Sequence, residues 1–469
     1  MLEESEILSQ QVPAPATHTG PKGGVREMLG IALPMVMSLS FDTLMVFIDR
    51  IYLSRLGPEY MSASLAGGNA SFLLLTFFMG LIGYATALVA QNLGAGHPEN
   101  GSKVLSHALG IAILSYPILL LLRPLGAVLF SKAGIDPLQL PPQIIFFETL
   151  VLGSLIPLFR HSFASFFSGI GETRIVMIAS LVGLVTNCTM NYALIFGHFG
   201  FPALGIRGAA IGTILAGAAS LLVLVSKYFS KDIRSRFHHP HSWKFYPGLL
   251  KEYVTKGAPS GIEFGLNMLA FQCMILIFDS RGLANATAAT IMFNWDMVTF
   301  VPLMGLEVAA TSLVGRYYGA RDAISAKRVT RSGILMGWVF SLVVLVAFLG
   351  IPEMLVNVFR PTPPGPIFLE AFPLAVLMIR IAAIYLLIES IMVVYAGALR
   401  GTGDTLWTMI IMVGLHWSLV LMLWLSFRYF DLGIITSWSV LVAGFMLFPL
   451  LLWMRWRIVA RKRITFADA

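Results

Sequence analysis

The sequence FFSGIGETR at residues 166–174 has a counterpart, ALRGTGDTL, at residues 398–406. Each copy follows a long apolar segment, and the two copies lie in different halves of the chain. A second pair supports the duplication, because YATALVAQNLGAG at 84–96 resembles VAATSLVGRYYGA at 308–320. Matches at several positions predict one structural unit that occurs twice.

The composition places this repeated unit in a membrane. Hydrophobic residues make up 57% of the chain, charged residues only 12%, and the mean hydropathy is +0.80. Such a chain is too apolar for a water-soluble protein. The apolar runs are continuous and long enough for helices, which need about 20 residues to cross a bilayer, whereas barrel strands are shorter and alternate. We expect spans near 28–55, 60–90, 104–130, 146–168, 175–197, 207–228, 257–280, 287–315, 327–350, 371–399, 405–429 and 435–456.

These segments predict an all-α integral membrane protein with 12 transmembrane helices in two pseudo-symmetric bundles of six. Because six is even, both bundles enter the membrane in the same direction and are related by an axis near the membrane normal. The predicted organisation is a cytoplasmic N-terminal tail (1–27), an N-lobe (28–228), a cytoplasmic linker (229–256), a C-lobe (257–456) and a basic C-terminal tail (457–469).

Lysine and arginine residues set the expected orientation. They are concentrated in the central linker and at the C-terminal end, and cytoplasmic loops of membrane proteins carry such an excess. We therefore expect a multi-pass protein of the cell (inner or plasma) membrane with both termini in the cytoplasm. The net charge of +8 follows from this topology, so we expect no nucleic-acid partner. Residues 1–27 lack the apolar core of a secretory signal.

Two prolines match between the halves. Pro34 in IALPMVMSLSFD and Pro259 in KGAPSGIEFGLN lie at corresponding places inside predicted helices. Each proline removes a backbone hydrogen bond and favours a bend. Matching bends suit a moving pair of helices, and static kinks that improve packing explain them equally well.

Ionisable side chains inside the predicted spans carry the functional signal, since a charge at the bilayer centre costs roughly 2.5 to 3.5 kcal/mol. Two interpretations are open. Arginines can neutralise the acids in structural ion pairs, or unpaired acids can carry protons and bind cations. Acids outnumber the two arginines, Arg160 and Arg380, so we favour function for the set, which is Asp42, Asp49, Glu263, Asp296, Glu307 and Glu389.

The sequence contains no recognisable catalytic motif. The scattered His161, His198 and His416 match neither a metalloprotease nor a hydrolase signature. His238, His239 and His241 are better explained as part of a solvated loop than as metal ligands. We expect no enzyme, no catalytic residue, no metal site and no cofactor other than a coupling ion.

The sequence resembles the multidrug and toxic compound extrusion (MATE) family over nearly its whole length. The similarity is carried by PMVMSLSFDTLMVFIDRIYLSRLG at 34–57, AQNLGAG at 90–96, NCTMNYALIFG at 187–197 and, above all, YAGALRGTGDT at 395–405. The resemblance implies two six-helix lobes around a central cavity. It also implies export of organic cations or lipophilic drugs in exchange for Na⁺ or H⁺.

In the N-lobe the resemblance assigns roles by position. Asp49 matches the first-helix aspartate that titrates or binds the ion, Pro34 matches the proline at which that helix bends, and Asn187 matches an asparagine of the ion site. Asn191 stands where many relatives have an aspartate, which leaves that site one negative charge short. Asp42, one heptad before Asp49, is a possible replacement.

In the C-lobe, Glu389 matches the acidic position of the tenth helix in NorM-type members. The seventh-helix glutamate of many members aligns with Asn267, while Glu263 offers a carboxylate one turn earlier on the same face. Glu263, Asp296 and Glu389 therefore form the expected acidic cluster.

The expected mechanism is antiport by alternating access, in which a cationic or lipophilic small molecule and the coupling ion compete for the same acids. The partners are the substrate and the lipid bilayer, and we expect a monomer. A lipid-linked precursor flippase of the same superfamily is the alternative. A flippase needs cations in its cavity to hold pyrophosphate, whereas this chain has mainly acids.

Overall fold

The computed structural model describes residues 21–132, 135–237, 243–361, 363 and 365–461, and every regular element in these residues is an α-helix. Eleven helical segments are long and apolar enough to cross a membrane. The number is twelve if α6 and α7, which meet at a bend of 49°, count as one span. The predicted fold class is confirmed. Parts of the predicted tails and linker, residues 1–20, 238–242 and 462–469, lie outside the described residues.

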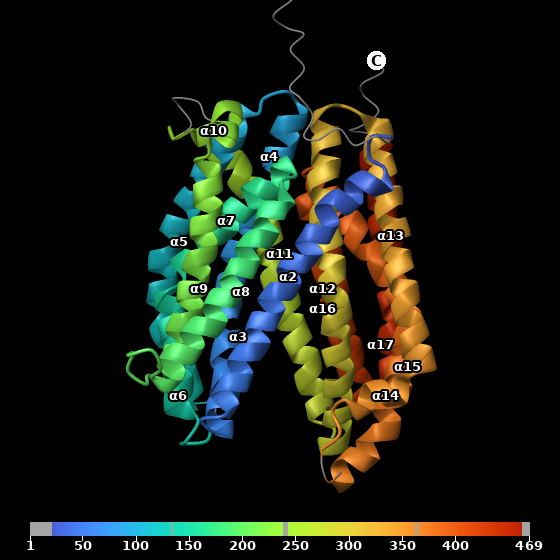
Figure 1. The fold of residues 1–469 in the computed structure, drawn as a ribbon. Coiled ribbons are helices and arrows are strands. Elements are labelled where there is room, and N and C mark those ends of the chain that lie inside the picture. The colour runs from blue at the N-terminus through green and yellow to red at the C-terminus, as the bar shows by residue number, and fades with distance from the viewer. Residues whose placement is uncertain (1–20, 133–134, 238–242, 362, 364, 462–469) are drawn as a thin grey trace, which may run out of the picture.

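The first half of the chain forms one bundle, on the left of Figure 1. Glycines and prolines mark several of its helix ends: Gly171 and Gly197 end helices in the left-handed conformation that favours glycine. The helices are α2 (Val25–Ser54), α3 (Pro58–Gly83), α4 (Ala85–Gly94), α5 (Glu99–Lys132), α6 (Leu140–Leu152), α7 (Leu155–Ile170), α8 (Thr173–Phe196), α9 (Gly205–Tyr228) and the short α10 (Lys231–Phe237).

The second half forms the other bundle, on the right of Figure 1. Its buried core includes Phe278, Met292 and Trp438, which come from three different spans. The helices are α11 (Pro247–Asp279), α12 (Leu283–Gly319), α13 (Ala323–Gly350), α14 (Pro352–Asn357), α15 (Pro366–Gly401), α16 (Thr405–Arg428), α17 (Ile434–Phe445) and α18 (Leu447–Val459).

Helix α2 crosses from one bundle to the other, as its diagonal course in Figure 1 shows. Near its start, Met28, Ile31 and Ala32 are buried in the core of the second bundle. Near its end, Leu53 is buried in a core cluster of the first bundle. A single helix thus connects the two bundles mechanically.

The duplication in the sequence is visible in the packing. Gly169 packs against the carbonyl oxygen of Thr86, and Gly401 packs in the same way against the carbonyl oxygen of Thr311. The hydroxyls of these threonines also match: Thr86 donates to the carbonyl of Ser165, and Thr311 donates to the carbonyl of Gly397. These two signature positions therefore favour glycine, because the backbone of a neighbouring helix lies against each of them.

The two bundles are joined at one end, which we call the closed end. There Gln91 donates to the carbonyl of Gly401 over 2.7 Å, and its repeat counterpart Arg316 donates to the carbonyl of Ile170 over 2.9 Å. Ser312 adds a hydrogen bond of 2.6 Å to the carbonyl of Ser168. At the opposite end, no hydrogen bond between described residues joins the two bundles.

The sequence missed some local features. Helix α11 begins at Pro247, before the predicted span at 257, so part of the predicted linker is helical. Proline at the first helical position favours this early start, because an N–H group at that position has no hydrogen-bond partner within the helix and its loss costs nothing. Helix α10, with Lys231 and Arg236, lies at the same end of the molecule as α4, at the top of Figure 1.

Candidate functional site

Asp49 is the buried acid of the first bundle. Only 7% of the residue is exposed, and its carboxylate accepts hydrogen bonds from the amide of Asn191 and, over 3.1 Å, from the hydroxyl of Thr213. These partners come from α8 and α9, so three helices meet at one carboxylate. No lysine or arginine of the described residues forms an ion pair with Asp49; the neighbouring Arg50 acts on it only at longer range.

Two amide side chains next to Asp49 have unused oxygens. Asn187 and Asn191 are both fully buried, and the side-chain oxygen of each has no hydrogen-bond donor among the described residues. Asn187 also lies close enough to the Asp49 carboxyl to interact with it. Buried amide oxygens without a donor are rare in native proteins. A carboxylate with two such oxygens is the kind of ligand set that hard cations favour.

Asp42 does not join Asp49. Its carboxylate forms a two-point ion pair with Arg160, with distances of 2.8 and 3.3 Å, and Arg160 also donates to Ser180 over 3.2 Å. Asp42 and Arg160 neutralise each other. For Asp42 the structural interpretation of the acids applies, and its charge is not available to replace the aspartate missing at Asn191.

The second bundle contains a different acidic pair. Asp296 on α12 accepts a hydrogen bond from the hydroxyl of Tyr385 on α15. Glu389, one turn further along α15, lies close enough for its charge to repel that of Asp296. One oxygen of Glu389 is buried with no partner among the described residues. Two interacting carboxylates without a cation favour a shared proton or a bound cation.

Three further candidates make no hydrogen bond to this pair among the described residues. The side-chain oxygen of Asn267 is buried without a partner, and no hydrogen bond between described residues links it to Asp296 or Glu389. Pro34 and Pro259 are buried inside α2 and α11, and both helices continue through them. The bends expected at these prolines remain a prediction.

Glu263 has a fixed counter-charge that the sequence analysis did not identify. Arg400 on α15 donates to Glu263 on α11 over 2.7 Å and also binds Glu307 on α12. Arg380, one of the two arginines considered from the sequence, instead lies 4.0 Å from Glu353, and both of these side chains are largely exposed.

The six acids therefore fall into two groups. Asp42, Glu263 and Glu307 bind arginines. The other three form no ion pair with any described lysine or arginine, and they are Asp49, Asp296 and Glu389. We call these three the unpaired acids.

The sequence contained signals for the residues that were missed. Arg400 lies inside the repeated signature ALRGTGDTL, and Tyr385 precedes Glu389 by four residues, which places both on one helix face. Thr213 gives no such signal, since threonines that bond to their own helix backbone are common in apolar helices.

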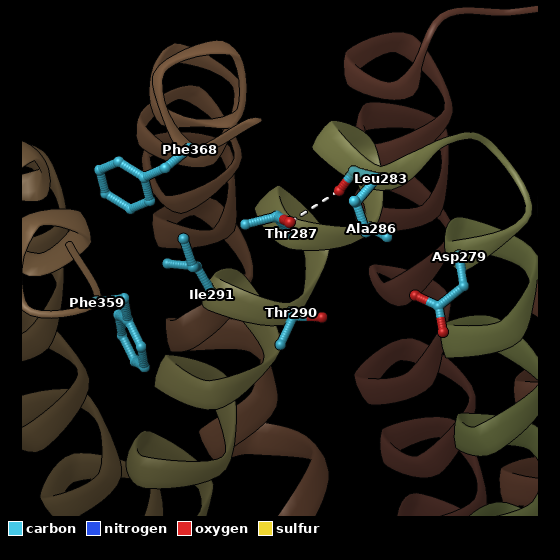
Figure 2. A pocket seen from close by; sticks show the side chains of 8 residues that line it. All are labelled: Asp279, Leu283, Ala286, Thr287, Thr290, Ile291, Phe359 and Phe368. Atoms are coloured by element: carbon cyan, nitrogen blue, oxygen red, sulfur yellow. Dashed lines mark hydrogen bonds between the residues drawn. The ribbon is translucent and has the colours of Figure 1, made fainter. Parts of the chain in front are cut away.

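A cavity of about 710 Å³ lies away from these acids. Figure 2 shows Asp279 at the end of α11 on one side, the start of α12 with Thr287 and Thr290 between, and Phe359 and Phe368 on the other. None of the predicted site residues is among those that line it. The cavity lies at the end of the molecule remote from the closed end, since α11 ends and α12 begins there.

Sequence comparisons connect this arrangement to known proteins. A family model described as MatE matches residues 34–193 and 259–424. A curated protein named "Probable multidrug resistance protein NorM", from Thermotoga maritima, is 29% identical over 430 residues, which covers 89% of each chain.

Solved structures share the fold. One, described as the outward-facing conformation of a multidrug resistance MATE family transporter of the MOP superfamily, has a TM-score of 0.85, is 21% identical and covers 95% of this chain and 99% of its own. Another, a MOP superfamily transporter from Pyrococcus furiosus described as having a binding pocket of reverse polarity, has a TM-score of 0.83, is 20% identical and covers 95% of this chain and 100% of its own. At these identities the similarity establishes the fold alone.

Proposed function

The chain belongs to the MatE family of membrane transporters, and on that premise we propose that it is a secondary active antiporter. It exports organic cations or lipophilic drugs and takes up Na⁺ or H⁺ in exchange. The observation that carries this proposal is that Asp49, Asp296 and Glu389 lie within candidate membrane-spanning helices without a cationic partner among the described residues.

An unpaired acid inside a membrane protein is stabilised by a positive charge that binds reversibly from solution. Arg160 neutralises Asp42, so this acid has no need of an ion from solution, whereas Glu263 and Glu307 share the single charge of Arg400. The energetic cost of burying an unpaired carboxylate falls when it takes up a proton or a cation. A drug cation reduces that cost in the same way, so cargo and coupling ion compete.

The two bundles provide different ion sites. In the first bundle, Asp49 with the free oxygens of Asn187 and Asn191 supports Na⁺, because all the ligands are oxygens. In the second bundle, Asp296 and Glu389 form a carboxylate pair with a tyrosine hydroxyl, which supports proton uptake.

The closed end supports alternating access. The inter-bundle hydrogen bonds lie at the end where α4, α12 and the signature loops meet. Arg234 and Arg236 of α10 and Arg457 of α18 lie at this end, and such an excess of basic residues supports a cytoplasmic location for it by the positive-inside rule. The conformation is then the one that faces outward, ready to release cargo and accept an ion. The location in the cell membrane and the monomeric state belong to the same proposal.

The alternative of a lipid-precursor flippase receives no support from the charges. Such a cargo carries pyrophosphate, which arginine or lysine side chains bind. Arg160 is neutralised by Asp42, Arg400 is shared by two glutamates, and Arg380 is exposed beside Glu353.

Aromatic side chains between the two bundles offer an apolar surface for the cargo. Phe72 of α3 and Phe264 of α11 form an edge-to-face pair across the bundle boundary, with ring centroids 6.0 Å apart. Aromatic rings at such a place support binding of flat cations by dispersion and cation–π contact.

Transport by purified protein in liposomes tests the proposal. Ethidium efflux is followed with an imposed Na⁺ gradient, with an imposed pH gradient and with neither. We expect one of the two gradients to drive ethidium against its concentration gradient. Glu353→Gln, an exposed acid outside the unpaired set, is the matched control and retains transport. Transport that neither gradient accelerates contradicts antiport.

A further inference from the structure

Arg400 binds two acids at once, near the closed end of the second bundle. Its guanidinium contacts Glu263 on α11 and Glu307 on α12, and the side chains of Glu263, Glu307 and Arg400 are 2%, 17% and 24% exposed. No other lysine or arginine of the described residues pairs with these glutamates. With both acids ionised, the three residues carry one net negative charge.

This net charge has an unsatisfied atom. The Oε2 atom of Glu263 is buried and has no hydrogen-bond partner among the described residues, and the Nε atom of Arg400 also lacks an acceptor. Leaving a buried carboxylate oxygen without a donor is costly. A proton on this oxygen, or a cation beside it, removes the cost and the excess charge together.

Glu307 and Arg400 lie on the same two helices as Asp296 and Glu389, nearer to the closed end. Glu307 follows Asp296 by eleven residues on α12, and Arg400 follows Glu389 by eleven residues on α15. Eleven residues are close to three helical turns, so each pair shares one face, with a separation of about 16 Å along the axis. Both helices run toward the closed end. The seam between α12 and α15 thus carries two polar layers at different depths.

An apolar layer separates the two polar layers. Leu303 on α12 and Val393 on α15 lie on the same faces between them, and they are 1% and 2% exposed. Since a charged or hydrated ion does not cross a dry apolar contact readily, the two layers are isolated from each other in this conformation. We call Asp296 and Glu389 the outer layer, and Glu263, Glu307 and Arg400 the inner layer.

The inner layer lies directly behind the boundary between the bundles. Gly261, half a turn before Glu263, packs so closely on α3 of the first bundle that a Cβ atom there would lie 2.3 Å from the carbonyl oxygen of Phe77. This close contact of α11 on α3 is part of the boundary between the bundles.

We propose that Glu263, Glu307 and Arg400 form a second binding station for the monovalent coupling cation, used on the way to the closed end. The inference rests on the proposed antiport. The cation, a proton or Na⁺, leaves Asp296 and Glu389 and is held at Glu263 before its release. Arg400 keeps the station at one net negative charge, so that it binds one monovalent cation and no more.

The test compares two transport assays in proteoliposomes for Glu263→Gln and Glu307→Gln. Each substitution keeps the size of the side chain and leaves a neutral pair between Arg400 and the remaining glutamate. The first assay measures ethidium transport driven by a Na⁺ gradient or, separately, by a pH gradient. The second measures exchange of labelled for unlabelled ethidium with no gradient, which requires no ion transfer. Whichever of the two gradients, Na⁺ or pH, drives ethidium transport identifies the coupling cation.

We expect each variant to lose at least tenfold in gradient-driven transport and to keep exchange within about twofold of the unmodified protein. Glu389→Gln, in the outer layer, loses both activities, and the exposed control Glu353→Gln keeps both. Normal gradient-driven transport in Glu263→Gln overturns the station, as does a parallel loss of both activities in either station variant. If the unmodified protein exchanges ethidium but responds to neither gradient, antiport itself fails, and the station fails with it.

Discussion

Gly94 and Gly319, which occupy matching places in the two halves, each pack against the backbone of the other's helix. A Cβ atom on Gly94 would lie 1.8 Å from the carbonyl oxygen of Arg316, and one on Gly319 would lie 2.0 Å from the carbonyl oxygen of Gln91. In both cases the contacted residue precedes the opposite glycine by three positions. The closed end is therefore built from two copies of the same close contact.

We predict that Gly94→Ala and Gly319→Ala each destabilise the closed end. The neighbouring atoms belong to backbone, so they cannot move aside as a flexible side chain does. The equilibrium should shift toward the conformation in which this end is open. Ethidium transport should fall at least tenfold because the protein cannot readily return to the conformation in which this end is closed. Distances between spin labels on α4 and α12 report the change.

Gly110→Ala is the matched control for the glycine substitutions. It lies inside a helix, and a Cβ atom there would meet nothing within 4 Å. It should leave the label distances and transport unchanged. Unchanged distances in Gly94→Ala and Gly319→Ala as well would mean that this contact does not determine the closed conformation.

A second glycine prediction concerns the site in the first bundle. A Cβ atom on Gly212 of α9 would lie 1.9 Å from the side-chain oxygen of Asn191. Gly212→Ala should push Asn191 away from Asp49 and weaken ion binding in this bundle by about tenfold, while Gly217→Ala, whose nearest neighbour is a side-chain methyl at 3.3 Å, should have little effect. Binding of Na⁺ by calorimetry distinguishes the two. Equal affinities in both variants would argue against Asn191 as a ligand.

Asp322 gives a prediction for stability at low pH. It caps α13 by accepting a hydrogen bond of 2.9 Å from the backbone of Ser325. Partial burial raises the pKa of Asp322, but the hydrogen bonds to Ser325 and the charge of Lys22 outweigh burial, so the pKa is lower than usual. The carboxylate therefore stabilises the fold above the pKa of the unfolded chain, near 4, and the contribution disappears as the pH falls through the lower folded value.

Asp322→Ala should lower the free energy of unfolding by about 1 kcal/mol at pH 7. Thermal unfolding in detergent at pH 7 and near pH 3 should show a smaller difference at the lower pH. Asp322→Asn keeps an acceptor for the cap without a charge, so it should be less destabilising and should lack the pH dependence. A difference between Asp322→Ala and the unmodified protein that is the same at both pH values would count against this cap.

The sequence was sufficient for the fold because a bilayer accepts few architectures. Each span must satisfy its backbone N–H and C=O groups within its own helix, so the length of the apolar runs alone located the helices. The bend at Gly153 and Ser154 between α6 and α7 was missed, because the apolar run continues through it.

The candidate site was only partly predictable. Sequence spacing placed Asp42 and Asp49 on one face of α2, but their fates differ because α7 brings Arg160 to the first and α8 brings Asn191 to the second. Such pairings depend on contacts between distant helices. Arg400 was overlooked for the same reason: it lies near a helix end in the sequence, and only the folded bundle shows it reaching back to Glu263 and Glu307.

The most direct test of the account is equilibrium binding of ethidium to the purified protein while Na⁺ concentration and pH are varied. If cargo and ion compete for the unpaired acids, the apparent Kd should rise in proportion to the coupling ion, about tenfold for each tenfold increase. Asp49→Asn and Glu389→Gln should each weaken that dependence, whereas Glu353→Gln should retain it. An apparent Kd that is indifferent to both ions in the unmodified protein would contradict the central claim.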